Sequence, residues 1–220
     1  METICGMNPA QQALMETFLK DNPALQSLEG EIAAALQLMQ STYDEGGKVM
    51  ICGNGGSAAD AEHIVGELMK GFLKKRPLND KERAMIEETP EMPADFADRL
   101  QGGLPALALT THSALLSAYA NDVDAAMVYA QQVWVLGEGN DTLVALSTSG
   151  NSKNVVNAVH AARAKGIRIV AITGEKESAL SALCDICLRV PSCETYRVQE
   201  YTLPVYHALC AMLEAAYFSV

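Results

Sequence analysis

Residues 51–67 read ICGNGGSAADAEHIVGE, in which a glycine-rich turn links an apolar strand to a predicted helix. Glycines let a backbone approach an anion closely, and a helix N-terminus offers unpaired N–H groups and a favourable dipole. Ser57 is the expected N-cap of this helix. The stretch therefore predicts a ligand-binding turn at the end of a strand.

The predicted helix carries His63 and Glu67, which are four residues apart. A turn of about 100° per residue brings both side chains to nearly the same side of the helix. There they can share a metal ion or a substrate, or they can form part of a solvated helix face. The pair alone does not decide between these interpretations.

Composition limits the class of protein. The chain has 220 residues, 49% of them hydrophobic, and a formal net charge of −11. This length suits one α/β domain with a small embellishment. An acidic chain with few clustered Lys and Arg residues is not expected to bind nucleic acid.

Two further features indicate the compartment. No apolar run approaches the roughly 20 residues that span a bilayer. The first residues, METICGMNPAQQ, have neither the basic start nor the apolar stretch of a signal peptide. We therefore expect a cytoplasmic protein without a membrane partner, and in that compartment its six cysteines are expected to be thiols.

Two short clusters suggest function but have simpler interpretations. Cys184, Cys187 and Cys193 are close enough in sequence for a zinc or redox site. However, Cys184 and Cys187 lie at the start of an apolar strand, so a structural role is expected. The basic residues 74–76, KKR, form a short cluster at the head of a loop. We expect them to be solvated.

The order of predicted elements indicates an α/β fold. Residues 8–45 predict two helices divided near Asn22 and Pro23, and we expect residues 1–46 to be oligomerisation helices. Helical stretches then separate five short apolar runs, which predicts a parallel sheet covered by helices on both faces. The expected strands are 48–52, 106–110, 142–147, 168–173 and 185–190. Ligands in such folds bind at the carboxyl ends of the strands.

Residues 74–105 interrupt this alternation with prolines, many charges and no strand pattern. We interpret this segment as an insertion. Asn79 is a candidate cap for a helix through Glu88, and Pro93 for the start of a second helix ending before Gly102. Because a wholly structureless loop of this length is unusual, we expect a helical flap or an intersubunit arm.

The second polar turn is STSGNS, residues 147–152, which follows the third expected strand and precedes a helix. Hydroxyl groups and backbone amides at a helix N-terminus suit a phosphate group, although an ordinary capped turn has the same composition. The glycine-rich turn at Asn54 forms a second polar loop on the same sheet edge. The two loops together favour phosphate binding.

Four motifs in order, GNGGSAADAEHIVGEL, the pair Asn121–Asp122, STSGNS, and RVQE followed by His207, resemble the sugar isomerase (SIS) domain family. Within it they are most similar to the phosphoheptose isomerases. The resemblance covers most of the chain outside the insertion. It implies a flavodoxin-like, three-layer fold and a cytoplasmic homotetramer with active sites between subunits. It also implies conversion of sedoheptulose 7-phosphate to D-glycero-D-manno-heptose 7-phosphate for bacterial surface glycans such as lipopolysaccharide.

The resemblance also implies roles for individual residues. Ketose-to-aldose conversion removes a proton from C1 and returns one at C2 through an enediol, while another proton moves between the oxygens. Glu67 is the expected carbon base, and His207 the group that serves the oxygens. A zinc ion, in members that bind one, would be surrounded by His63, Glu67, Gln199 and His207. The substrate would contact Asn54, Gly55, Gly56, Ser57, Asn121, Asp122, Ser147, Thr148, Ser149, Ser152 and Gln199.

One spacing limits this zinc site. Gln199 and His207 are eight residues apart, which on an ideal helix is a rise of roughly 12 Å, so the two side chains cannot comfortably reach one ion. Either Gln199 precedes the regular helix or two subunits contribute. Pro204 favours an interruption, since proline fits best in a first helical turn.

The remaining histidines carry weaker expectations. His112 follows the second expected strand, where it either lines the cleft or has a capping or buried role. His160 is in the middle of a predicted helix and is expected to be structural.

The chain departs from the family pattern at the insertion, at Thr202, where a histidine often follows the QE pair, and at Ala120, where glycine commonly precedes the ND pair. The insertion leaves room for a different phosphosugar. A noncatalytic SIS protein that senses a phosphosugar, or docks on a partner such as a replication initiator, is the alternative. The presence of both Glu67 and His207 favours the enzyme. A transcription factor is not expected, because the sequence has no helix-turn-helix pattern.

Overall fold

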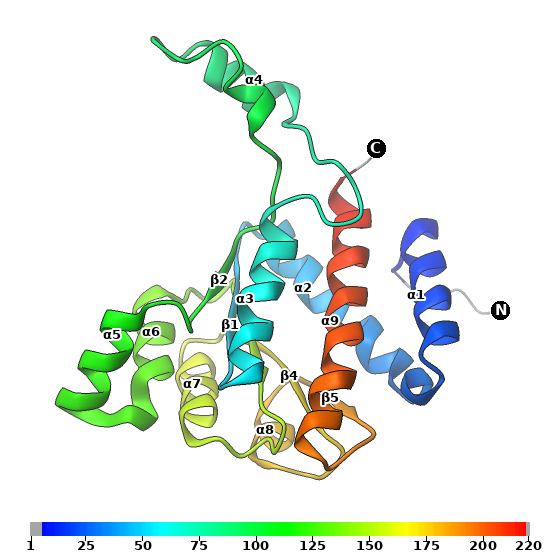
Figure 1. The fold of residues 1–220 in the computed structure, drawn as a ribbon, viewed down its shortest axis with the longest axis vertical. Helices are drawn as coiled ribbons and strands as arrows, with labels where there is room; N and C mark the ends of the chain where they lie inside the picture. Colours follow the sequence, from blue (N-terminus) through cyan, green and yellow to red (C-terminus); the bar gives the residue numbers. More distant parts are fainter. Residues whose placement is uncertain (1–5, 219–220) are drawn as a thin grey trace.

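Five parallel strands form the sheet of the computed structural model, which describes residues 6–218 (Figure 1). Their order across the sheet is β2-β1-β3-β4-β5. The strands are β1 (Val49–Cys52), β2 (Ala106–Ala108), β3 (Thr142–Leu146), β4 (Arg168–Gly174) and β5 (Ile186–Val190). Each agrees with its predicted range to within two residues, so the predicted parallel α/β fold is confirmed.

Strand β1 lies where the strand order reverses. Its residue Ile51 pairs with Ala108 of β2 on one side and with Val144 of β3 on the other. The chain runs from β1 outward to β2 and then returns to β3 on the far side of β1. In open α/β sheets such a reversal opens a crevice at the carboxyl ends of the strands, where ligands bind.

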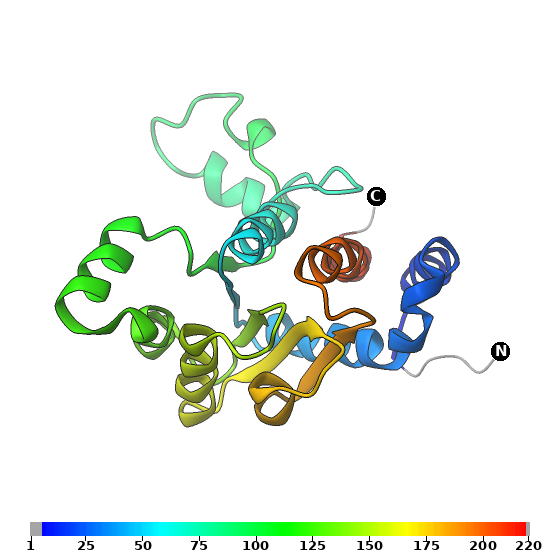
Figure 2. The same cartoon turned by 60° about the horizontal axis from the view of Figure 1, so that its bottom comes forward.

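Alternate residues of the central strands face two separate apolar layers. Val49 and Ile51 of β1 belong to one buried cluster, whereas Met50 and Cys52 belong to the other. The first layer contains α1 (Pro9–Asp21), α2 (Glu29–Asp44), α3 (Gly56–Met69) and α9 (Thr195–Tyr217). The second contains α6 (Val128–Leu136), α7 (Lys153–Ala164) and α8 (Ala179–Leu183), visible on the other side of the sheet in Figure 2. The predicted three-layer arrangement follows from this alternation.

The N-terminal helices divide where the sequence predicts, with a 3₁₀ segment (Pro23–Leu28) between α1 and α2. Asn8 and Gln11 form a capping box at the start of α1. The buried side chain of Gln11 also donates a hydrogen bond to the carbonyl of Met212 in α9, with an N–O distance of 3.1 Å. These helices therefore pack on their own chain, and their role in oligomerisation stays a prediction. Residues 1–5 of the predicted 1–46 segment lie outside the described residues.

The insertion projects away from the sheet and its covering helices (Figure 1). Its helix α4 (Asp80–Glu87) is capped by Asn79, as predicted, and Glu82 completes a capping box there, but no residue of α4 is buried. The second predicted helix is wrong, because after Pro93 there is only a 3₁₀ turn at Ala97–Arg99. Of this stretch only Ala97 is buried, so packing cannot stabilise a longer helix.

Arg76 contradicts the expectation that the basic cluster is solvated, since its side chain is 1% exposed. Its Nε donates to Oε1 of Glu214 at 2.7 Å. Its terminal nitrogens donate to the carbonyls of Glu67 and Leu68 at the end of α3, at 2.9 and 2.7 Å. The guanidinium also lies over the ring of Phe218. A sequence cluster of three basic residues thus contains one buried anchor.

Glu214 completes this anchor from α9. Its carboxylate accepts backbone hydrogen bonds from Phe72, Leu73 and Lys74 at 2.9, 2.8 and 3.1 Å. Desolvation raises the pKa of Glu214, but the hydrogen bonds from Phe72, Arg76 and Leu73 outweigh it and lower this pKa below its ordinary value. The ion pair therefore joins the end of α3, the base of the insertion and the end of α9.

Replacement of Arg76 by Met should lower the free energy of unfolding by about 3–5 kcal/mol, because it leaves the Glu214 carboxylate buried without its partner. Chemical denaturation measures this loss. Arg83→Met is the matched control, since Arg83 pairs with Asp98 in the exposed part of the insertion and should have little effect. Equal losses in both variants would contradict the anchoring role.

Glu214 should also make stability sensitive to acid. A lowered folded-state pKa means that the charged carboxylate stabilises the fold above the unfolded-state pKa of about 4.3, and that this contribution is lost as pH falls further. Unfolding free energies measured below about pH 4.3 should therefore fall more steeply with decreasing pH in the wild type than in Glu214→Gln. An equal slope would show that another carboxylate dominates.

Candidate functional site

The glycine-rich turn and the STSGNS turn are joined by a pair of side-chain amides. Asn54 follows β1, and Asn154 lies in the first turn of α7. Each amide nitrogen donates to the other residue's oxygen, at 2.9 and 2.8 Å. The hydroxyl of Tyr129 donates to the carbonyl of Gly53 at 2.7 Å and so supports the same turn. The two predicted loops therefore meet at the reversal point of the sheet.

The start of α3 differs from the prediction. The helix begins at Gly56 and its N-cap is Gly55, so the assignment of Ser57 as the N-cap is wrong. Gly55 has a φ of +57°, a conformation that favours glycine. This conformation lets the helix begin before Ser57. Ser57 is buried in the first turn, and its N–H donates to the carbonyl of Asn54 at 3.1 Å.

The STSGNS turn has the features of a phosphate cradle. The hydroxyl oxygens of Ser147 and Ser152 are 3.1 Å apart. Thr148 and Ser149 line a polar cavity of about 270 Å³, together with Lys176 and the acidic residues Glu175 and Glu177 from the loop after β4. Hydroxyl groups, a helix N-terminus and one ammonium group suit a phosphate. The sequence analysis missed Lys176, although its place directly after a strand on this edge is the signal that identifies it.

His63 and Glu67 interact across one turn of α3, as their spacing predicts. His63 Nε2 and Glu67 Oε1 are 3.0 Å apart, and Glu67 is 8% exposed. The other ring nitrogen of His63 is 2.8 Å from the hydroxyl oxygen of Tyr206 on α9. Lys70 Nζ donates to Glu67 Oε2 at 3.3 Å. Tyr206 and Lys70 are thus two further neighbours of the pair that sequence reasoning missed.

His207 faces this pair from α9. Its ring centroid is 5.1 Å from that of His63 and 5.4 Å from that of Phe72. Burial, and secondarily the charge of His63, lowers the pKa of His207, while Glu67 acts in the opposite direction. Its Nε2 is buried and has no hydrogen-bond partner. A neutral imidazole with an unpaired ring nitrogen is therefore available for chemistry.

Gln199 lies at the other end of the site. Helix α9 is continuous from Thr195 to Tyr217, so Gln199 does not precede the regular helix, and Pro204 is inside it rather than in its first turn. The first of the two alternatives for Gln199 and the expected interruption at Pro204 are therefore wrong, and a contribution from two subunits stays a prediction. The helix continues through Pro204 because the apolar face of α9 is buried on either side of it. A Cβ atom on Gly56 would lie 2.4 Å from Gln199 Nε2, so the amide rests against the glycine-rich turn.

Asn121 and Asp122 are predicted sugar contacts from a third segment of the chain. They lie exposed in a π-helical turn (Ala120–Asp124) after α5 (Ser113–Tyr119), and Asn121 donates to Asp122 at 2.8 Å. In Figures 1 and 2 helix α3 lies between α5 and α9. Their contact with the sugar stays a prediction.

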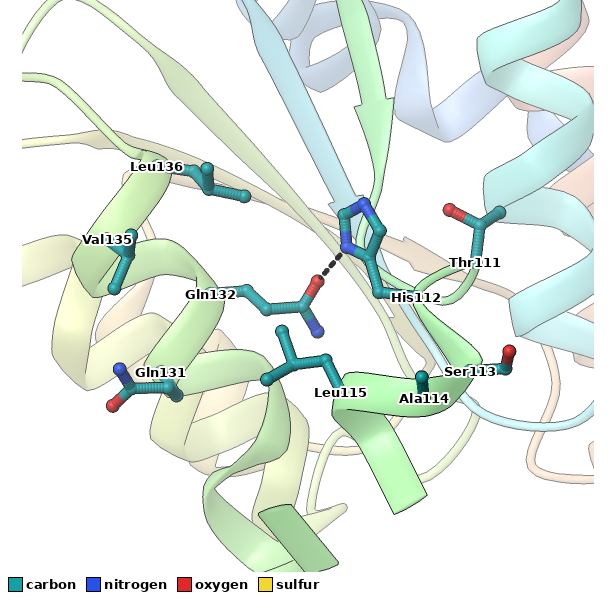
Figure 3. Close-up of a pocket in the computed structure, with 9 residues that line it drawn as sticks. All are labelled: Thr111, His112, Ser113, Ala114, Leu115, Gln131, Gln132, Val135 and Leu136. Carbon is teal, nitrogen blue, oxygen red and sulfur yellow. Dashed lines mark hydrogen bonds between the residues drawn. The ribbon is translucent and has the colours of Figure 1, made fainter. Parts of the chain in front are cut away.

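A separate cavity of about 630 Å³ lies between α5 and α6 (Figure 3). His112 points into it and its Nδ1 is 2.6 Å from Oε1 of Gln132. Leu115, Val135 and Leu136 make much of the remaining lining apolar. His112 thus lines a cavity, but not the one beside the phosphate cradle, and this apolar lining suits hydrophobic side chains rather than a phosphosugar.

The donor types of His63, Glu67 and His207 fit zinc, which binds imidazole nitrogen and carboxylate oxygen, and the unpaired Nε2 of His207 is a free ligand. Within residues 6–218, however, no three His, Cys, Asp or Glu side chains are arranged to hold a metal ion. Gln199 lies roughly 12 Å from His207 along the same helix. A complete four-ligand set is not formed by one chain.

The cradle and the acid/base pair are also separated. Glu67 lies eleven residues beyond Gly56 in α3, a helical rise of roughly 16 Å. The Asn54–Asn154 pair holds the phosphate cradle near the start of that helix. A bound phosphosugar would therefore meet the cradle at one end of α3, while Glu67 and His207 lie toward the other.

Comparison with known proteins identifies the family. The SIS domain model matches residues 22–103 and 85–174. Phosphoheptose isomerase from Rhodospirillum rubrum is 40% identical over 185 residues, 84% of this chain and 85% of that protein. The chain belongs to the phosphoheptose isomerase group of the SIS domain family. The phosphoheptose isomerase from Aneurinibacillus thermoaerophilus is 36% identical over 92% of this chain and 88% of its own length.

The structural comparison agrees. The structure of phosphoheptose isomerase from Neisseria gonorrhoeae matches this SIS chain with a TM-score of 0.71 and 32% identity, covering 93% of this chain and 98% of that one. The structure of the Francisella tularensis phosphoheptose isomerase gives the same TM-score at 29% identity. The predicted SIS fold is therefore confirmed.

Gly56→Ala should raise KM for the substrate by about tenfold, because a new methyl group displaces Gln199 from the turn while leaving helix α3 intact. Gly66→Ala is the matched control in the same helix, since a Cβ there meets nothing within 4 Å. That control should stabilise the protein by roughly 0.5–1 kcal/mol and leave KM unchanged. Steady-state kinetics measures the change in KM, and thermal unfolding measures the change in stability. An unchanged KM in Gly56→Ala would show that Gln199 is not part of the binding site.

Proposed function

We propose that this protein is an aldose–ketose isomerase that converts sedoheptulose 7-phosphate to D-glycero-D-manno-heptose 7-phosphate, for bacterial surface heptose such as that of lipopolysaccharide. The observation that carries the proposal is the position of Glu67 and His207 on facing helices, both beside His63. Two relatives that each cover more than four fifths of the chain are named phosphoheptose isomerase. A binding protein needs the phosphate loops but no such acid/base pair.

The cradle would bind the substrate through its phosphate. Ser147, Thr148, Ser149 and Ser152 offer hydroxyl donors. Lys176 adds a positive charge to the cavity that Thr148 and Ser149 line. Binding at this fixed point positions the carbon chain of the sugar. The binding energy of a phosphate remote from the reacting carbons then contributes to orientation at C1 and C2.

The isomerisation requires two proton movements. The carboxylate of Glu67 removes a proton from C1 and returns it at C2 of the enediol. His207, held neutral at physiological pH by its lowered pKa, accepts the proton of the C1 hydroxyl and delivers a proton to the C2 oxygen. Proton transfer to and from His207 restores its starting state, so the reaction consumes no external acid or base.

Zinc is proposed as the cofactor, because the donor atoms of His63, Glu67 and His207 suit this metal. These three side chains would have to move closer together to hold the ion. When bound, zinc would polarise the substrate carbonyl as a Lewis acid. Gln199 of the same chain is too distant to complete the set, so its contribution would come from a second copy.

We further propose a homotetramer with active sites between subunits. The phosphate cradle and the Glu67–His207 pair are separated along α3, so an approaching copy would bring the two halves together. Helix α4 has no buried residue, and a helix of this length is marginal without packing, which favours its docking on another subunit. The exposed side chains of Trp134, Val135 and Leu136 on α6 offer an apolar surface for such contacts.

A cytoplasmic location is part of the proposal. In the part of the chain that the structure describes, no helix combines the length and apolarity that a membrane span requires. The alternative is a noncatalytic SIS protein that senses a phosphosugar or docks on a protein partner. This alternative does not explain why Glu67 and His207 lie close together. It is therefore the less favoured function.

Incubation of the purified protein and zinc with sedoheptulose 7-phosphate should give an aldose phosphate, detected by coupled assay or NMR. Glu67→Gln and His207→Ala should each lower kcat by at least about a hundredfold, because each removes a proton-transfer group. His160→Ala is the matched control, since His160 is exposed on α7, and it should retain wild-type activity.

Failure of the folded, zinc-supplied wild type to turn over this substrate would contradict the proposed substrate. Other phosphosugars would then be compared by the same assay. Binding of a phosphosugar without turnover of any would favour the sensing protein.

A further inference from the structure

Helix α3 presents three polar side chains along one stripe. Asp60, His63 and Glu67 are three and four residues apart, so they lie on the same side of the helix. Helix α9 lies beside α3 in Figures 1 and 2, and its residue Tyr206 contacts the first two of these side chains. The proton transfers of the proposed reaction use neither Asp60 nor Tyr206.

Tyr206 links Asp60 to His63 through one hydroxyl group. The residue is 2% exposed. Its hydroxyl donates to Oδ1 of Asp60 at 3.3 Å, and the hydroxyl oxygen is 2.8 Å from Nδ1 of His63. The rings of Tyr206 and His63 also meet edge to face, with centroids 5.5 Å apart. Packing therefore holds the hydroxyl group between its two partners.

The number of available protons decides the direction of these contacts. A hydroxyl group has one proton to donate, and a carboxylate only accepts. Burial, followed by the charge of Asp60, raises the pKa of Tyr206, so the hydroxyl keeps its proton. Burial also raises the pKa of Asp60, but the hydrogen bond from Tyr206 and the charge of His63 act against this shift and favour the carboxylate.

Because the hydroxyl proton is donated to Asp60, the oxygen of Tyr206 can only accept from His63. The donor in the 2.8 Å contact is then Nδ1–H of the imidazole. This assignment holds for both a neutral and a protonated His63, since each can carry a proton on Nδ1. The hydroxyl of Tyr206 therefore selects the ring nitrogen of His63 that is protonated.

The Nδ1 proton determines the role of the other ring nitrogen. A neutral imidazole has one N–H group, so Nε2 of His63 is left with a lone pair. Nε2 lies 3.0 Å from Oε1 of Glu67, while the other carboxylate oxygen of Glu67 accepts from Lys70 at 3.3 Å. Two acceptors at this distance attract each other only through a shared proton or metal ion. His63 and Glu67 thus present two ligand atoms to one cation.

We propose that Tyr206 and Asp60 are positioning residues, which hold His63 with a proton on Nδ1 and with Nε2 directed, beside Glu67, at a bound cation. Asp60 orients the Tyr206 hydroxyl, and the Tyr206 oxygen holds the imidazole. Histidines that ligate metals usually donate their second N–H in this way, and the acceptor fixes the tautomer and the ring orientation. That the cation is zinc rests on the proposed function.

The first test detects the proton on His63 and needs neither metal nor substrate. Long-range proton–nitrogen NMR of the metal-free protein, with isotope-labelled histidine, should show a protonated Nδ1 in His63. The signals of this residue are assigned by their loss in His63→Gln. Tyr206→Phe removes the acceptor but keeps the ring, so Nδ1 should lose its proton and Nε2–H should donate to Glu67.

Tyr43→Phe is the matched control for this NMR experiment. Among the described residues the buried hydroxyl of Tyr43 has no hydrogen-bond partner, so its loss should leave the His63 signals unchanged. An unprotonated Nδ1 in the wild type, or the same pattern in Tyr206→Phe as in the wild type, would overturn the proposal.

The second test measures zinc affinity by competition with a chromophoric chelator. Tyr206→Phe should raise the Kd for zinc by roughly 10- to 100-fold, the effect typical of removing the hydrogen-bond partner of a ligating histidine. Tyr43→Phe should bind zinc like the wild type. An unchanged Kd in Tyr206→Phe would refute the role of Tyr206 toward the cation.

Two substitutions of Asp60 separate its hydrogen bond from its charge. Asp60→Asn keeps an oxygen that can accept from Tyr206, whereas Asp60→Ala has none. The Kd for zinc should therefore rise more in Asp60→Ala than in Asp60→Asn. In the Tyr206→Phe background the two substitutions should have equal effects, because the hydroxyl that Asp60 orients is absent. A difference that persists in that background would overturn the positioning role of Asp60.

Failure of the proposed function has a different signature. A wild type that shows the protonated Nδ1 but binds no zinc would refute the proposed cofactor alone. A wild type that binds zinc with the expected dependence on Tyr206, but turns over no phosphosugar, would refute the proposed reaction and leave the positioning of His63 intact.

Discussion

A fully buried ion pair between Arg76 and Glu214 fixes the part of the molecule on which the candidate chemistry depends. Arg76 donates to the last carbonyls of α3, and Glu214 accepts from the backbone that follows that helix. Burying two charges is costly unless their hydrogen-bonding groups are satisfied, and here the carboxylate has several partners and the guanidinium has three. The result is a fixed relation between α3, which carries Glu67, and α9, which carries His207. The insertion leaves the domain directly after this anchor, so buried hydrogen bonds hold its base even though its helix α4 has no buried residue.

The same two helices also separate the site into halves. The N-terminal turns of the two helices hold the glycine-rich turn and Gln199, next to the phosphate cradle. His63, Glu67 and His207 lie further along the same helices. A rise of roughly 16 Å along α3 separates Gly56, in the glycine-rich turn, from Glu67. Under the proposal of active sites between subunits, a phosphosugar bound at one cradle would react with Glu67 and His207 of another copy. Association of subunits would then be a condition for catalysis.

The sequence predicts those features that depend on local periodicity. The alternation of apolar runs and helices identifies all five strands, and four-residue spacing places His63 and Glu67 on one face of α3. The errors occur where packing between distant segments decides the structure. Arg76 is buried because Glu214 lies opposite it, far along the chain, and the local sequence KKR contains no sign of that partner. Pro204 stays inside a helix because burial of α9 outweighs the missing N–H, which a proline pattern alone does not reveal.

The most direct test of a site divided between subunits is complementation between two inactive variants. Glu67→Gln removes the carbon base, and Ser149→Asp places a negative charge in the exposed phosphate turn. The two proteins are unfolded together, refolded as a mixture, and assayed for conversion of sedoheptulose 7-phosphate. If each site takes its cradle and its carbon base from different chains, about a quarter of the sites in randomly mixed oligomers are intact, and the mixture recovers about that fraction of wild-type activity. A mixture no more active than either variant alone would show that one chain contains the whole site.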